Sequence, residues 1–200
     1  MKFRVGQGID MHRYKDGDHI ILAGVKVPHT MGIDAHSDGD VVLHSITDAL
    51  LGALALGDIG QWFPDSDPDL ADIDSKALIL PIIMSMRDNG YELNNLDVTI
   101  IAEAPKIGDY KDEIKQSLLD LFEADKDQIN IKATTAEKMG SIGRMEGIEA
   151  HAIVSLIGGH TTIEHTSNHF MLMPDELDTS RTDVHEILEL DEIELDSEDL

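Results

Sequence analysis

Alternating strand-like and helix-like segments fill the first 159 residues, and this order limits the possible folds more than any other feature of the sequence. Four segments have the period-two or short apolar pattern of strands: 3–12, 97–103, 128–134 and 147–157. Three have apolar residues at helical spacing: 41–56, 75–89 and 110–124. We therefore expect a single α/β (α+β) domain with a mixed four-stranded sheet and helices packed on one face.

The pattern stops at Gly158-Gly159, and the acidic charge is divided unevenly there. Residues 1–159 carry 27 acidic and 14 basic side chains, whereas residues 160–200 carry 13 acidic side chains and a single basic one, Arg181. The last segment keeps neither a strand nor a helix period over a useful length. We expect a domain over 1–159 and an acidic C-terminal tail over 160–200, disordered or partly helical. An interaction peptide and a weak histidine metal site are the alternatives for this tail.

The net charge of −25 and the absence of cysteine exclude several functions. Binding to nucleic acid or to anionic lipid requires a basic surface, so neither partner is expected. Disulfides and thiolate chemistry are excluded. No signal-like or membrane-length apolar run begins the chain. We expect a cytoplasmic protein whose anionic ligands are met by local donors or by metal.

Asp10 and His12 form the first candidate metal site. They are two residues apart on the first predicted strand, so both side chains leave the same face. His44 lies on the next predicted helix, with Asp48 one turn away and able to orient it or a neighbouring ligand. Two imidazoles, one carboxylate and an open position are typical of catalytic zinc. The same residues are also compatible with a common Asp-x-His pair and a buried structural histidine.

Two further clusters suit a phosphate-containing ligand. The run AHSDGDVVLH, 35–44, places His36 and Ser37 just before a helix, where free backbone N–H groups attract anions. The run KATTAEKMGSIGR, 132–144, combines hydroxyls, a carboxylate and cations, as a diphosphate with a divalent ion would require. Helix capping and surface cations are the simpler interpretations of both. A turn-rich acidic loop at 58–68 suits a substrate loop or an ordinary surface turn.

Taken in order, GQGIDMH, AHSDGDVVLHSITDALLGALALGDIG, FPDSDP, DVTIIAEAPKI and KATTAEKMGSIGR resemble the 2-C-methyl-D-erythritol 2,4-cyclodiphosphate synthase family of the non-mevalonate isoprenoid pathway. The resemblance covers about residues 3–158. It implies a compact homotrimer with active sites between subunits. It also implies cyclisation of 4-diphosphocytidyl-2-C-methyl-D-erythritol 2-phosphate, in which the 2-phosphate attacks the β-phosphorus and CMP leaves.

The resemblance also assigns roles to residues. Asp10, His12 and His44 would hold Zn²⁺ or another divalent transition metal, and Glu137 would help to hold Mg²⁺ or Mn²⁺. His36 and Thr135 would stabilise the transition state. The remaining matched positions would contact substrate: Ser37, Asp58, Ile59, Gly60, Phe63, Pro64, Asp65, Ser66, Asp67, Ala102, Pro105, Lys106, Ile107, Gly108, Ala133, Thr134, Ser141 and Arg144. Of these, Ser141 and Arg144 would line the central cavity of the trimer.

Two other functions remain compatible with parts of the sequence. A metal-dependent phosphohydrolase needs only the carboxylate and imidazole cluster with phosphate-binding loops. A non-catalytic acidic binding protein would act through the tail at 160–200. The products formed from the diphosphocytidyl substrate separate the two enzymes, and removal of the tail separates both from the binding protein.

Overall fold

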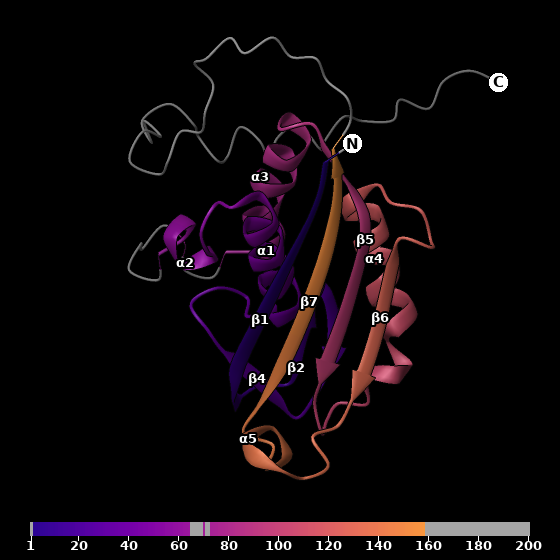
Figure 1. Ribbon diagram of the computed structural model, residues 1–200. Helices are drawn as coiled ribbons and strands as arrows, with labels where there is room; N and C mark the ends of the chain where they lie inside the picture. Colours follow the sequence, from indigo (N-terminus) through magenta and orange to yellow (C-terminus); the bar gives the residue numbers. More distant parts are fainter. Residues whose placement is uncertain (1, 65–69, 71–72, 159–200) are drawn as a thin grey trace, which may run out of the picture. The chain divides into compact units, whose positions relative to one another are not determined.

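The computed structural model describes residues 2–64, 70 and 73–158. A single mixed sheet forms one layer of this domain, with the strand order β4-β1-β7-β5-β6 (Figure 1). Its strands are β1 (Lys2–Asp16), β4 (Met31–Asp34), β5 (Tyr91–Ile101), β6 (Ile129–Thr134) and β7 (Gly147–Gly158). All neighbours pair antiparallel except β5 and β6, which are parallel.

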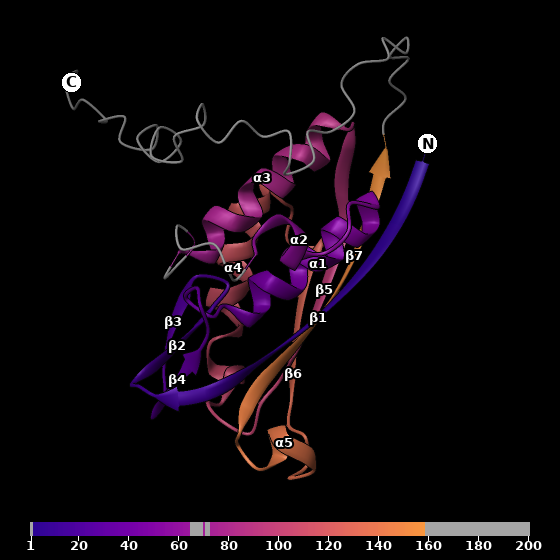
Figure 2. The same ribbon diagram turned by 90° about the vertical axis from the view of Figure 1, so that its left-hand side faces the viewer.

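Helices cover one face of this sheet, as the view along the layers shows (Figure 2). The long helices are α1 (Val41–Leu54), α3 (Ser75–Asp88) and α4 (Lys111–Phe122). Short helical turns lie in the connections: α2 (Ile59–Trp62), η2 (Ile107–Asp109) and α5 (Gly140–Gly143). The three long helices confirm the helices predicted from the sequence. Within the described ranges, no helix combines the length and the apolar composition needed to cross a bilayer.

The α+β class and the one-sided helix layer are confirmed, but the predicted count of four strands in the main sheet is wrong. The fifth strand is β4, which pairs with the end of β1 from Arg13 to Asp16. A separate hairpin, β2 (His19–Leu22) with β3 (Val25–Pro28), was also missed. These strands have only four residues each, too few for a period-two pattern to stand out.

The core lies between the sheet and the helices, and α1 is its centre. Every side chain of α1 between Val41 and Leu43 is fully buried, as are Ile46 and Leu50. Helix α1 packs against β1, β7 and α3, so it is covered on most sides. An almost entirely apolar helix is stable only in such a position.

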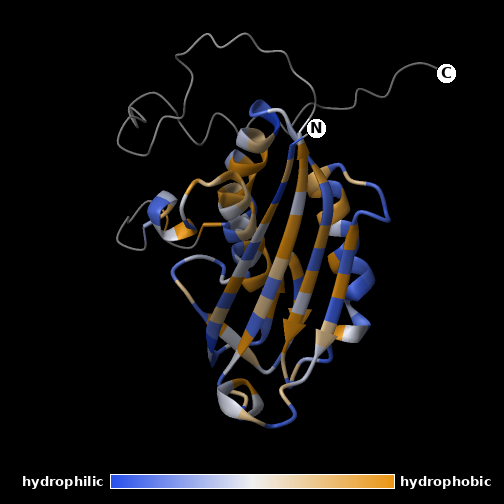
Figure 3. Ribbon diagram, viewed as in Figure 1, coloured by the Kyte–Doolittle hydropathy of each residue, from blue (hydrophilic) through white to orange (hydrophobic). Residues whose placement is uncertain are grey.

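Among the described residues, no helix covers the opposite face of the sheet (Figure 1), and β1 mixes hydrophobic and hydrophilic residues along its length (Figure 3). Phe3, Val5, Ile9 and Met11 point to this open face and are 46–63% exposed. Ile153 of β7 joins them, since it pairs with Gln7 of the same face. The strand is therefore half-buried as predicted, but its alternate residues on the other side, including two glycines, are the ones that face the core. Several exposed apolar side chains on one face are typical of an interaction surface.

Candidate metal centre and active site

Two glycines of β1 bring helix α1 unusually close to the sheet. A Cβ atom at Gly6 would lie 1.9 Å from the backbone oxygen of Ala49, and one at Gly8 would lie 2.0 Å from that of Ser45. Both distances are far shorter than any van der Waals contact, so only glycine fits here. Asp10 and His12 follow on the same face of β1. The close approach thus places them beside His44, the neighbour of Ser45 on α1.

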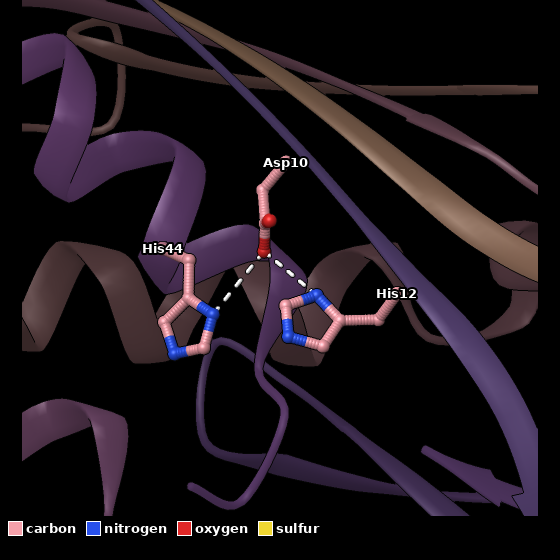
Figure 4. A group of neighbouring side chains, drawn as sticks. All are labelled: Asp10, His12 and His44. Carbon is pink, nitrogen blue, oxygen red and sulfur yellow. Dashed lines mark hydrogen bonds and ion pairs between the residues drawn. The ribbon is translucent and has the colours of Figure 1, made fainter. Parts of the chain in front are cut away.

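Asp10, His12 and His44 converge on one point (Figure 4). The Asp10 Oδ2 atom lies 2.9 Å from His12 Nδ1 and 3.2 Å from His44 Nδ1. One potential ligand atom from each side chain lies within 4.8 Å of the others. Among the residues that the structure describes, no other histidine, aspartate or glutamate joins this group.

The charges within the triad favour an ionised carboxylate. Burial raises the pKa of Asp10, but the neighbouring His12 and His44 imidazoles outweigh this effect and lower the pKa from 3.8 to about 2. Burial lowers the pKa of His44, but hydrogen bonding and attraction to Asp10 outweigh it and raise that pKa. The triad therefore presents a negative carboxylate oxygen that stabilises a positive charge on the neighbouring His44 ring.

The donor set fits a divalent transition metal. His12 Nδ1 is buried and makes no hydrogen bond of acceptable geometry, although the Asp10 carboxylate is adjacent. Such an orphaned nitrogen is costly unless a ligand or ion satisfies it. Two imidazole nitrogens and one carboxylate oxygen are the ligand types that zinc and related ions prefer, with a fourth position left open. The side chains are only 12–23% exposed, so water has limited access.

The far side of the His44 ring is also held. Its Nε2 atom lies 2.8 Å from Ser75 Oγ, at the start of α3, and 3.2 Å from Ser37 Oγ. Sequence reasoning missed Ser75, since no local pattern links residues so far apart along the chain. Asp48, the expected orienting residue, instead accepts a hydrogen bond from the backbone N–H of Ile59 at 2.8 Å.

The segment before α1 places Ser37 beside this group. Asp40, fully buried, caps the helix by accepting hydrogen bonds from the N–H groups of Val42 and Leu43. Its second oxygen accepts from Gly24, which ties the β2-β3 hairpin to the helix. Ser37 contacts His44, whereas His36 is exposed on the connecting turn. The helix start is capped, as predicted, by an aspartate rather than open to an anion.

The structure describes the first part of the predicted substrate loop after α1. Asp58 caps the short helix α2, which contains Ile59 and Gly60, by accepting from Gln61 N–H. Phe63 is half-buried and Pro64 is exposed. Residues Asp65, Ser66 and Asp67 lie outside the described residues, as does the acidic tail from 160 onward.

The other predicted substrate residues gather at the ends of β5 and β6. Ala102 N–H donates to the backbone oxygen of Thr134, so the two segments lie side by side. Thr135 donates to Glu137, and both are exposed. The structure thus brings together these members of the predicted site: Ala102, Pro105, Lys106, Ile107, Gly108, Ala133, Thr134, Thr135 and Glu137.

Glu103, which the sequence analysis did not single out, holds this second group in place. Its Oε1 atom accepts hydrogen bonds from Ala136 N–H at 3.1 Å and Lys138 N–H at 3.0 Å. Glu137 and Lys138 both have positive φ angles, so the loop adopts a backbone shape that side-chain-bearing residues rarely take. The glutamate stabilises this shape.

Ser141 lies in α5 and Arg144 at its end, directly after the loop that Glu103 holds. Both are exposed, and the Arg144 guanidinium forms an ion pair with Glu146 at 2.6 Å. The structure therefore brings part of the predicted site together in two groups. One is the metal triad with Ser37. The other, here called the loop group, consists of the residues from 102–108 and 133–137 at the ends of β5 and β6.

Comparison with known proteins agrees with this geometry. The model of the YgbB family matches residues 3–157. A 2-C-methyl-D-erythritol 2,4-cyclodiphosphate synthase of Acinetobacter baylyi is 53% identical over 154 residues, which are 77% of this chain and 94% of the relative.

Solved structures give the same result. IspF of Plasmodium falciparum in a CDP complex is 34% identical with a TM-score of 0.69, covering 78% of this chain and 96% of the other. The bifunctional IspDF of Campylobacter jejuni is 40% identical with a TM-score of 0.76. That match covers 79% of this chain but only 43% of the longer bifunctional chain. The chain belongs to the YgbB family, the family of 2-C-methyl-D-erythritol 2,4-cyclodiphosphate synthases.

Proposed function

We propose that this protein converts 4-diphosphocytidyl-2-C-methyl-D-erythritol 2-phosphate into 2-C-methyl-D-erythritol 2,4-cyclodiphosphate and CMP. A new bond forms between a 2-phosphate oxygen and the β-phosphorus, while the bond from that phosphorus to the CMP oxygen breaks. No side chain needs to act as a nucleophile. The protein must bring the two ends of one flexible molecule together, for which intramolecular reactions gain a large effective concentration.

The convergent triad of Asp10, His12 and His44 is the observation that carries this proposal. A family member without that cluster would lack the means to neutralise a highly anionic substrate. The chain's net charge is −25, so general attraction cannot supply this effect. Family membership identifies the reaction, and the triad provides the local chemistry that the reaction requires.

The proposed triad ligand set would hold Zn²⁺ or another divalent transition metal. A bound divalent ion supplies positive charge that offsets repulsion between the attacking phosphate and the diphosphate. We assign a second ion, Mg²⁺ or Mn²⁺, to Glu137, which is exposed and lies within hydrogen-bond reach of Thr135.

The chain's own residues would position the substrate around these charges. His36 and Thr135 would donate hydrogen bonds to phosphate oxygens as charge redistributes in the transition state. Ser37 and the segments Asp58–Gly60 and 63–67 would hold the erythritol part. The segments Ala102–Gly108 and Ala133–Thr134 would enclose the cytidine; the CDP bound to the Plasmodium falciparum relative supports recognition of such a group.

We further propose a homotrimer with active sites between subunits. The open sheet face exposes a row of apolar side chains along β1, which a second copy would cover. The loop group presents Thr135 and Glu137 to solvent, so a neighbouring copy would complete the site around them. In this assembly Ser141 and Arg144 would line the central cavity.

Product analysis tests the proposed reaction. Purified protein with zinc and magnesium, incubated with the diphosphocytidyl substrate, is expected to release CMP and a cyclic diphosphate, identified by phosphorus NMR. His12→Ala should abolish both. His19→Ala is the matched control, because this more exposed histidine also pairs with an aspartate but lies outside the triad.

Two other results would redirect the proposal. A linear phosphate product would indicate the phosphohydrolase. Loss of function on removal of residues 160–200, with cyclisation absent from the full chain, would indicate the binding protein. The domain boundary at Gly159 and a cytoplasmic location stay predictions from the sequence.

A further inference from the structure

A chain of hydrogen bonds leads from the His44 ring away from the triad. His44 Nε2 lies 2.8 Å from Ser75 Oγ, and Ser75 Oγ lies 2.5 Å from Asp38 Oδ1. The Ser75 backbone N–H also contacts the second oxygen of Asp38 at 3.2 Å. Ser75 is only 1% exposed, so water does not compete for these bonds.

The direction of these bonds follows from the donors available. An ionised carboxylate can only accept, so the single Ser75 hydrogen points to Asp38. Ser75 Oγ must then accept from His44, and the ring hydrogen therefore resides on Nε2. This leaves the Nδ1 lone pair of neutral His44 directed at Asp10 Oδ2, 3.2 Å away. The two lone pairs then face each other, an arrangement that a cation bound by both atoms stabilises.

Asp38 is itself fixed, so it can impose this direction on its neighbours. Its backbone N–H donates to Ile73, just before α3, and its Oδ1 atom also accepts from the N–H of Asp40. The loop before α1 and the start of α3 are thereby joined at the residue that ends the chain of hydrogen bonds. These bonds keep the Asp38 carboxylate facing Ser75, so Ser75 continues to donate to Asp38 and to accept from His44.

We propose that Ser75 and Asp38 are positioning residues of the metal centre, which set the His44 tautomer and ring orientation so that Nδ1 is available as a ligand. The inference rests on the metal centre of the proposed function. Buried partners that orient a ligating histidine typically change metal affinity by about 10–100-fold when removed. Neither residue touches the substrate or the ion in this role.

Zinc affinity of the full chain, measured by chelator competition, provides the first test. Ser75→Ala is expected to bind zinc about 10–100-fold more weakly than wild type. Ser75→Thr keeps the hydroxyl and should recover most of the affinity. Ser45→Ala is the matched control, because it removes another buried hydroxyl next to His44, one that bonds only to the Val42 carbonyl. It should bind zinc within about twofold of wild type, since no ring contact is lost.

The tautomer of His44 provides a second measurement. A residue that only stabilised the fold would not change the position of the ring hydrogen. Nitrogen NMR of the metal-free protein, at a pH where His44 is neutral, should show the hydrogen on Nε2. Asp38→Ala removes the acceptor that fixes the Ser75 hydrogen, so Ser75 can donate to His44 Nε2 instead and the ring hydrogen should move to Nδ1. This variant decides the question even if Ser75→Ala does not fold.

The two levels of the proposal fail differently. A wild-type chain that does not bind zinc would overturn the metal centre itself. A wild-type chain that binds zinc, with Ser75→Ala binding equally well or Asp38→Ala keeping the hydrogen on Nε2, would overturn only the positioning role.

Discussion

The two groups of predicted site residues differ in how far a single chain completes them. The triad is assembled from β1 and α1 within one core, and its ligand atoms lie within 4.8 Å of one another. The loop group at the ends of β5 and β6 is anchored in the core at Ala102 and Ile107 but exposed at Thr135 and Glu137, where Glu103 holds the backbone. Packing of the core preorganises the triad, whereas the loop group presents Thr135 and Glu137 to solvent.

This difference indicates which half depends on assembly. A triad built around two glycine contacts needs no second copy to form. In the proposed trimer, the exposed loop group would gain a substrate pocket from another copy that faces it. Burial of the exposed apolar side chains of β1 would favour association of copies. The proposed trimer would therefore both cover this face and complete the site at the loop group.

The largest expected effect comes from breaking the assembly while sparing the triad. Ile9→Asp places a charge on the open face in the middle of β1, where Ile9 is 46% exposed in the single chain. We expect a monomer by light scattering, with activity reduced about 100-fold or more because the second half of the site is lost. Zinc stoichiometry should stay at the wild-type value. Met84→Asp changes an apolar position on α3 that is 56% exposed and should stay trimeric and active. An active Ile9→Asp monomer would contradict the shared site.

Mixing two inactive variants tests the same division more directly. His44→Ala lacks the triad and Glu137→Ala lacks the loop group. If each site takes one half from each of two subunits, an equal mixture after subunit exchange should recover about one quarter of wild-type activity. A mixture of His44→Ala with His12→Ala should recover none, since both defects lie in the same half. Absence of recovery in the first mixture, with exchange verified by mass, would place both halves in one chain.

A smaller effect is expected from loosening the contact that builds the triad. Gly8→Ala would place a methyl group 2.0 Å from the Ser45 backbone oxygen and force α1 away from β1. We expect a loss of about 1–3 kcal/mol in the free energy of unfolding, measured in urea, together with weaker zinc binding. Gly52→Ala on the same helix has its nearest neighbour at 4.0 Å and should be neutral or stabilising. Equal stability of the two variants would show that the close approach is not required.

The sequence predicted most of this architecture because long elements carry a clear period. The long helices and four of the five strands of the main sheet follow from residues repeated over many positions. Strand β4 was missed because Met31–Asp34 is too short for such a pattern and owes its pairing to β1. The orientation of β1 is also informative: its apolar side is the open one, and its glycines face the core.

The triad could be predicted because two of its members share a strand face and the third opens the next helix. Ser75 and Asp38 could not, since their contact with His44 depends on how α3 packs against the loop before α1. The same reason explains why Glu103 was not singled out: its partners Ala136 and Lys138 lie beyond a parallel crossover. The spacing of residues along the sequence identifies the candidate ligands. The residues that support them are distant in sequence and can be identified only in the three-dimensional structure.

The smallest expected effect concerns the charges of the triad in metal-free protein. The pKa of Asp10 is lowered to about 2, so its contribution is present above its unfolded value of 3.8 and is lost as pH falls toward 2. The pKa of His44 is raised, so its contribution is present below 6.5 and is lost as pH rises through the raised value. Stability should therefore be highest between about pH 4 and 6.5, with Asp10 worth about 2 kcal/mol there. Asp10→Asn should weaken the pH dependence of the free energy of unfolding, measured in urea, on both the acidic and the basic side of this range. Asp18→Asn removes the partner of His19 on the surface and should leave the profile almost unchanged. A wild-type profile without these two limbs would mean that the triad charges do not interact before metal binds.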